Sequence, residues 1–195
     1  MTTSKKTETE LKLQDAGTQM RLAISNAASE EVFRSCINAY LATSRSVTMV
    51  MEKESADFGQ PLLDWYKHSI QPFAEAPFFK FFNSQRVHSV HRGVVHPTKQ
   101  VFRTAHFCSE GDVVNSSASD VVHHLEVLSE CAPANEGDVL SLMPDGTMVT
   151  WVFDEFKDVW PHHSGNVLAL CEMHFLALKR LVLDWLAQKA SISER

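Results

Sequence analysis

Apolar side chains recur at helical spacing over two long stretches of this chain, and this pattern constrains the fold more than any other feature of the sequence. The first stretch runs from Val32 to about Lys53, shortly after Ser29, a residue type that suits the N-cap of a helix. The second follows Ser164 and continues to about Lys189. Helices with one apolar face bury that face against other helices, so the sequence predicts a helical bundle.

Proline and glycine residues divide the region between these two helices into shorter elements. Pro61 suits a first helical turn, and the apolar pattern after it predicts a second helix that ends before Pro72. Pro77 opens a third helix, which is rich in aromatic residues and ends at Gly93. Residues 11–28 remain ambiguous, because a glycine interrupts a weak helical pattern there.

The region 97–163 changes character and predicts a partly β-stranded insertion before the last long helix. Residues 100–107 alternate between apolar and polar side chains, and residues 147–153 are rich in β-branched and aromatic residues. Residues 120–130 suit a short helix between these strands. We therefore expect a mainly α fold, a bundle of four to five helices with a small β-containing insertion, in one domain. Its parts are a disordered tail (1–10), the helical bundle (29–96 and 164–190) and the acidic insertion (97–163).

Composition and motifs disfavour several classes of protein. No apolar run approaches the roughly 20 residues that a membrane span needs, and the polar N-terminus lacks the apolar core of a secretory signal. We therefore expect a cytoplasmic protein that does not contact membranes. The four cysteines form no C-x-x-C pair and are expected to be free thiols. Glycine-rich dinucleotide motifs and P-loops are absent from the sequence, and we expect no cofactor.

Charge is divided into two blocks along the chain. The net charge of −6 disfavours a protein that coats nucleic acid non-specifically. Residues 76–109, however, hold five basic side chains, four histidines and no acid, whereas residues 110–158 hold eleven acids and one base. This asymmetry predicts an electropositive site beside an acidic lobe. Alternatively, the two blocks pair with each other in the fold.

The segment RVHSVH, residues 86–91, lies inside the basic block and is followed by Arg92. Metal-free cleavage of RNA needs one group that takes the 2′-OH proton, one that protonates the leaving 5′ oxygen, and a cation that holds the phosphate. His91 suits the proton transfer near neutral pH, and the guanidinium of Arg86 suits the phosphate. A symmetric partner could supply the second proton-transfer group.

Two other interpretations of this segment remain open. His88 and His91 share one helix face, as in some zinc sites, but the adjacent arginines and the lack of a carboxylate disfavour a bound metal, and we expect none. Alternatively, the arginines and histidines stabilise the C-terminal end of a helix through its dipole. Because R-x4-H spacing is unspecific, spacing alone favours this structural role.

The order of several short motifs resembles the HEPN superfamily (higher eukaryotes and prokaryotes nucleotide-binding). A long helix is followed by FGQPLLDWY, then by an aromatic-rich helix that carries RVHSVH, and then by a helix break. The resemblance covers residues 30–96 and the last helix, about half of the chain. It implies a bundle of four or five helices that forms a homodimer.

In active members of the superfamily, two such motifs face each other across the dimer and form a metal-independent endoribonuclease, as in toxin and defence proteins. By position, the resemblance implies that Arg86 contacts the phosphate and that His91 is the catalytic imidazole. Arg45, in the first long helix, is implied as a supporting residue.

The basic side chains around this motif are further candidates for RNA binding, namely Lys80, His88 and Arg92. A non-catalytic role is the alternative, because active members commonly carry Asn, Asp or His after the arginine, and this chain has Val87 there. In that case the resemblance implies a module that binds a nucleotide, RNA or a protein partner.

Overall fold

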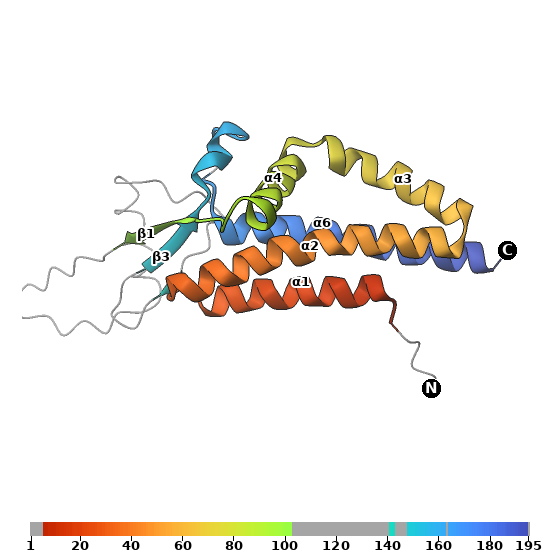
Figure 1. Cartoon of the computed structure of the whole chain (residues 1–195), viewed down its shortest axis with the longest axis horizontal. Helices are drawn as coiled ribbons and strands as arrows, with labels where there is room; N and C mark the ends of the chain where they lie inside the picture. The colour runs from red at the N-terminus through yellow and green to blue at the C-terminus, as the bar shows by residue number, and fades with distance from the viewer. Residues whose placement is uncertain (1–5, 103–140, 143–147, 163, 195) are drawn as a thin grey trace, which may run out of the picture.

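The computed structural model describes residues 6–102, 141–142, 148–162 and 164–194, and it is mainly α-helical (Figure 1). In chain order the elements are α1 (Glu8–Ser25), α2 (Glu30–Phe58), α3 (Gln60–Glu75), α4 (Pro77–His91), β1 (Thr98–Phe102), β2 (Ser141–Leu142), β3 (Met148–Val152), the short 3-10 helix η1 (Asp154–Asp158) and α6 (Val167–Ser193). The mainly α fold predicted from the sequence, with a small sheet before the last long helix, is confirmed.

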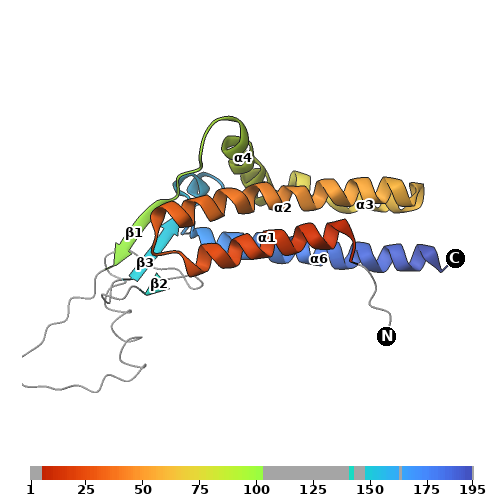
Figure 2. The ribbon, with the colours of Figure 1, turned by 60° about the horizontal axis from the view of Figure 1, so that its bottom comes forward.

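Helices α2 and α6 are the two longest elements of the bundle. In Figures 1 and 2, α1, α2 and α6 run along the long axis of the molecule, and α3 returns beside α2. Helix α4 turns away from that axis, and the strands lie at the end of the bundle where α2 and α6 begin. The aromatic-rich helix is therefore placed against the middle of the bundle, between α3 and the sheet.

The buried apolar side chains form two clusters along the bundle. In the first, Trp151 of β3 stacks on Phe33 of α2 with ring centroids 4.5 Å apart, and its Nε1 donates to the carbonyl of Ala27 at 2.8 Å. In the second, the buried Trp185 of α6 donates from Nε1 to Oγ of Ser55 at 2.8 Å. Each indole adds a satisfied hydrogen bond to a large apolar contact, so each of the two clusters contains a buried tryptophan with a paired N–H.

The sheet has the strand order β1-β3-β2, and both pairings are antiparallel. On one side of β3, Thr98 of β1 pairs with Val152, and on the other side Leu142 of β2 pairs with Met148. Strand β3 therefore lies in the centre of the sheet, and all of its residues are buried. The strand expected at residues 147–153 is confirmed. The other expected strand begins earlier, at Thr98, and its residues after Phe102 lie outside the described part of the chain, as does the short helix expected at 120–130.

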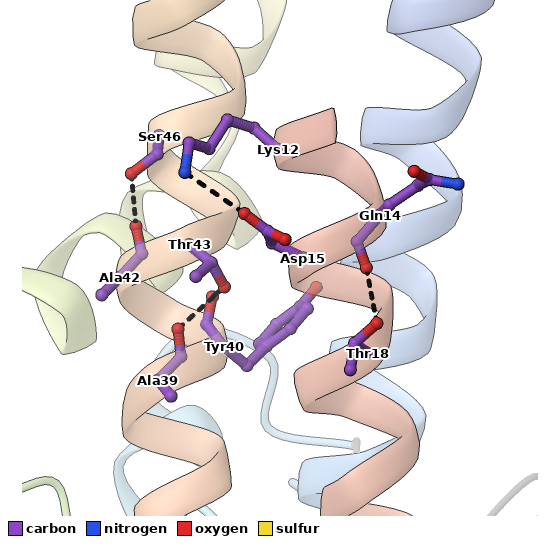
Figure 3. Close-up of polar contacts among 9 residues, drawn as sticks. All are labelled: Lys12, Gln14, Asp15, Thr18, Ala39, Tyr40, Ala42, Thr43 and Ser46. Atoms are coloured by element: carbon purple, nitrogen blue, oxygen red, sulfur yellow. Dashed lines mark hydrogen bonds and ion pairs between the residues drawn. The ribbon is translucent and has the colours of Figure 1, made fainter. Parts of the chain in front are cut away.

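Helix α2 carries several hydroxyl side chains that bond to its own backbone. Figure 3 shows Thr43, which donates to the carbonyls of Ala39 at 2.8 Å and Tyr40 at 3.2 Å, and Ser46, which donates to Ala42 at 3.1 Å. These local bonds satisfy the hydroxyl groups without a partner from another helix. A long helix with this many serine and threonine residues is therefore compatible with a buried, packed position.

Helix α1 begins inside the segment that we expected to be a disordered tail, so that prediction is wrong for residues 8–10. Thr7 and Glu10 form a reciprocal capping box, and Glu54 of α2 accepts hydrogen bonds from the backbone of Glu8 and from Thr9. These contacts satisfy backbone N–H groups that the first turn of a helix leaves unpaired. The same helix resolves the ambiguous residues 11–28 as helical as far as Ser25.

Two further helix boundaries differ from the prediction. Helix α3 continues through Pro72 to Glu75, although a proline there removes one backbone hydrogen bond and crowds the carbonyl of His68. At the start of α6 the N-cap is Asn166, whose side-chain oxygen accepts from the backbone of Ala169 at 2.9 Å. Ser164, the expected cap, instead accepts a hydrogen bond from the backbone of Asn166.

Candidate functional site

A pocket of about 220 Å³ opens between α2, α3, α4 and α6. Its wall combines apolar and basic side chains, and its lining residues are Leu41, Ser44, Arg45, Thr48, Ile70, Phe73, Ala74, Phe79, Lys80, Phe82, Asn83, Arg86, His174 and Leu178. Three of the residues singled out from the sequence therefore meet here, although they come from two different helices.

These three are Arg45 of α2 and Lys80 and Arg86 of α4. Arg45 and Lys80 are exposed and Arg86 is half-buried, so the positive charge lies toward the mouth of the pocket. Arg45 is held by Thr48, whose Oγ1 accepts from Nη1 at 2.8 Å. Within the part of the chain that the structure describes, no carboxylate forms an ion pair with any of the three. Their charge is therefore available to an anion.

Helix α4 is held by core packing in its middle and by hydrogen bonds near its C-terminal end. Phe81 and Phe82 in its middle are buried in the core. Near its C-terminal end, Ser89 donates to Oδ1 of Asn38 at 2.6 Å, and the same oxygen accepts from the backbone of Val95 at 2.9 Å. Asn38 thus ties the end of α4 and the segment after it to α2, which fixes the direction of the side chains on the last two turns.

The inner wall of the pocket holds a buried histidine, His174 of α6, which is 7% exposed. Its ring stacks on Phe82 with centroids 4.2 Å apart, and its Nδ1 lies 2.9 Å from the hydroxyl of Tyr40. In Figure 3, the Tyr40 side chain leaves α2 on the side where α1 and α6 lie. Burial lowers the pKa of His174 to about 3 and raises that of Tyr40 well above its ordinary value, so both side chains are neutral near pH 7.

The other predicted site residues lie at the C-terminal end of α4 and at its C-cap. His88, His91 and Arg92 are exposed and do not line the pocket. Five residues of an α-helix rotate a side chain by about 140°, so Arg86 and His91 point to different faces. The structure does not bring them together within one chain. Val87 is half-buried.

Comparison of the chain with protein-family models, curated proteins and solved structures finds no match. The HEPN resemblance therefore stands on the sequence motifs alone. Among the described residues, no cluster of three or more His, Cys, Asp or Glu side chains could hold a metal ion. None of the helices that the structure describes is long and apolar enough to cross a membrane.

His174 is the buried titratable pocket residue that the sequence interpretation missed. It lies at helical spacing between Cys171 and Leu178, on the buried face of α6, where the pattern showed only an apolar stripe. A histidine at such a position indicates a buried imidazole that needs a partner. The sequence contains no local signal that this partner is Tyr40 or that the ring reaches a pocket.

Proposed function

We propose that this protein is a HEPN-like module that binds the phosphate group of a nucleotide or of RNA in the basic pocket. The supporting observation is the convergence of Arg45, Lys80 and Arg86 with no ion-pair partner among the described residues. A guanidinium can donate two parallel hydrogen bonds to phosphate oxygens, and an ammonium adds a compact charge. Three like charges repel one another, and an anion bound between them relieves that repulsion.

The size and lining of the pocket support a small ligand. At about 220 Å³ it lies below the roughly 300 Å³ at which cavities for drug-sized ligands start, so it encloses only part of a nucleotide. Phe73 and Phe79 from α3 and α4 line the same pocket and offer an apolar surface to a base or sugar. A single nucleotide unit, free or at an unstacked position of RNA, fits this combination of charge and aromatic surface.

Calorimetric titration with AMP and with adenosine tests this function. We expect AMP to bind and adenosine to bind at least about tenfold more weakly, because one or more charge-assisted hydrogen bonds to the phosphate are lost. Equal affinity for the two ligands, or no binding of AMP, would overturn the proposal.

A second candidate function is metal-independent RNA cleavage by a homodimer. The observation that favours it is the exposure of His91 on the last turn of α4, next to the exposed Arg92 and close to the helix end at Gly93. There an imidazole is accessible both to RNA and to the same motif of a second copy. In this mechanism one His91 takes the 2′-OH proton and that of the second copy protonates the 5′ oxygen.

This second function is tested by incubation of RNA with the protein in EDTA. Replacement of a general acid or base lowers rates by about 100-fold or more, so His91→Ala should abolish most of the cleavage. His68→Ala, which removes an exposed histidine from α3, is the matched control and should leave it unchanged. Absence of cleavage by the wild type, or equal cleavage by the His91→Ala variant, would exclude His91 catalysis.

A further inference from the structure

Three polar side chains that line the basic pocket are at least nine-tenths buried, namely Ser44, Thr48 and His174. The two hydroxyl groups donate to backbone carbonyls of their own helix, which leaves the imidazole of His174 as the polar group of the inner wall. Leu41, Phe82 and Leu178 line the same inner wall and are buried, whereas the basic side chains lie toward the exposed mouth. A ligand with one charged end and one apolar end therefore has a preferred direction in this pocket. Its charged end stays near the cations and water, and its apolar end is buried against His174.

The hydrogen bonds behind this wall determine which nitrogen of His174 carries the proton. The hydroxyl of Tyr40 lies 2.9 Å from the carbonyl oxygen of Cys171 and 2.9 Å from Nδ1 of His174. The carbonyl can only accept, so Tyr40 donates its single proton to Cys171. Both hydrogen bonds form at once only if Nδ1–H donates to the Tyr40 oxygen. The lone pair of the imidazole is then on Nε2.

Nε2 of His174 has no hydrogen-bond partner among the described residues. It is not sealed inside the protein either, since no described side-chain nitrogen or oxygen is both fully buried and unpaired. The pocket is the opening that His174 lines. The ring thus presents a fixed, unpaired hydrogen-bond acceptor to whatever occupies the inner part of the pocket.

We infer that Nε2 of His174 is a specificity-determining group, which selects nucleotides whose base carries an N–H donor on the edge that enters the pocket. This inference rests on the proposed binding of phosphate at Arg45, Lys80 and Arg86. The amino group of adenine is such a donor. A base without a donor leaves the acceptor desolvated and unpaired, which is more unfavourable than the mere absence of one hydrogen bond.

The imidazole keeps this role across the physiological pH range. Because its pKa is lowered to about 3 by burial, the ring does not gain a proton at Nε2 near pH 7 and remains an acceptor. Stacking on Phe82 and the bond to Tyr40 hold the ring in place before a ligand binds. A pre-oriented acceptor discriminates between ligands more strongly than a mobile one, since it cannot turn away from a mismatched group.

The test compares AMP with purine riboside 5′-monophosphate, which lacks the amino group and has no N–H donor on its base. The wild type should bind AMP at least about 10-fold more tightly than the analogue, because the analogue lacks one hydrogen bond and leaves the buried acceptor unpaired. In His174→Phe, which removes both ring nitrogens and leaves Tyr40 paired with Cys171, this preference should disappear. Equal affinity of the wild type for both nucleotides would overturn the inference.

Two controls separate this inference from the proposed function. Arg86→Gln should lower the affinity for both nucleotides by a similar factor and leave the ratio of the two affinities unchanged, because both nucleotides carry the same phosphate. In ¹⁵N-histidine spectra of the wild type, the Nε2 resonance of His174 should shift when AMP binds and much less when the analogue binds. This measurement does not depend on the folding of a variant. If the wild type binds both nucleotides with equal affinity and Arg86→Gln lowers both affinities, the phosphate site is supported and the selection of the base by His174 is wrong. If neither binds, the proposed function itself fails.

Discussion

The hydroxyl oxygen of Tyr40 on α2 lies 2.9 Å from Nδ1 of His174 on α6, and Phe82 of α4 stacks on the face of the same imidazole with ring centroids 4.2 Å apart. One buried ring therefore joins three helices around the basic pocket. It is held by a hydrogen bond and by stacking between neutral groups, since burial disfavours its charged form. The packing of the bundle thus sets the orientation of this ring.

Acid should destabilise the wild type more than the His174→Phe variant. An unfolded histidine binds a proton below about pH 6.5, whereas folded His174, with a pKa of about 3, stays neutral. Between these values the unfolded state binds more protons, so the free energy of unfolding decreases as pH falls, by up to about 1.4 kcal/mol per pH unit. Urea unfolding at about pH 6.5 and about pH 4.5 should show an excess loss of about 2–3 kcal/mol in the wild type. Equal losses in the two proteins would show that His174 does not resist protonation.

Gly165, before α6, should tolerate no side chain. Its φ is 75°, and a Cβ there would lie 2.7 Å from the carbonyl oxygen of Phe153, whose own N–H donates to the Gly165 carbonyl at 2.9 Å. Gly165→Ala should lower the free energy of unfolding by about 2–4 kcal/mol, through backbone strain and a backbone clash. Gly93→Ala is the matched control, because φ is also positive there and nothing lies within 4 Å of the new methyl group. It should cost about 1 kcal/mol in denaturant unfolding, and similar losses for both variants would argue against the clash.

Glu54 should contribute to stability by capping α1. Its carboxylate accepts from the backbone N–H of Glu8 and Thr9, both at 3.1 Å, and from the Thr9 hydroxyl at 2.6 Å. Glu54→Ala should therefore lower the free energy of unfolding by about 1–3 kcal/mol. The exposed Glu52, on the same helix, is the control, and its alanine variant should stay within about 0.5 kcal/mol of the wild type in thermal unfolding. If the Glu54→Ala variant has the same free energy of unfolding as the wild type, the start of α1 does not depend on this cap.

Helix boundaries were predictable where local chemistry decides them. Pro77 and Gly93 delimit α4 as expected, because proline fits a first turn and glycine adopts the positive φ of 153° after the last one. Pro72 misled the prediction, since a proline near the end of a helix does not stop it. The start of α1 was missed although Thr7 and Glu10 form a local capping box, and only the additional cap from Glu54 is remote in sequence.

The basic pocket was predictable only in part. The acid-free block of residues 76–109 pointed to Lys80 and Arg86, and the HEPN resemblance added Arg45. Their meeting at one mouth depends on how α4 crosses α2, which no local pattern encodes. The separation of Arg86 from His91 has a different cause, the rotation of about 140° over five residues of one helix, and it follows from the sequence once α4 is known to be helical.

The most direct test of the central claim is the binding of a fluorescently labelled single-stranded RNA by two matched variants, Arg86→Gln and Arg92→Gln. Both remove one positive charge from α4, but only Arg86 lines the pocket, and Arg92 is exposed at the helix end. If the pocket holds the phosphate, Arg86→Gln should weaken binding by about tenfold or more and Arg92→Gln by much less. Equal effects, or a larger effect of Arg92→Gln, would contradict the account and move the binding surface to the exposed end of α4.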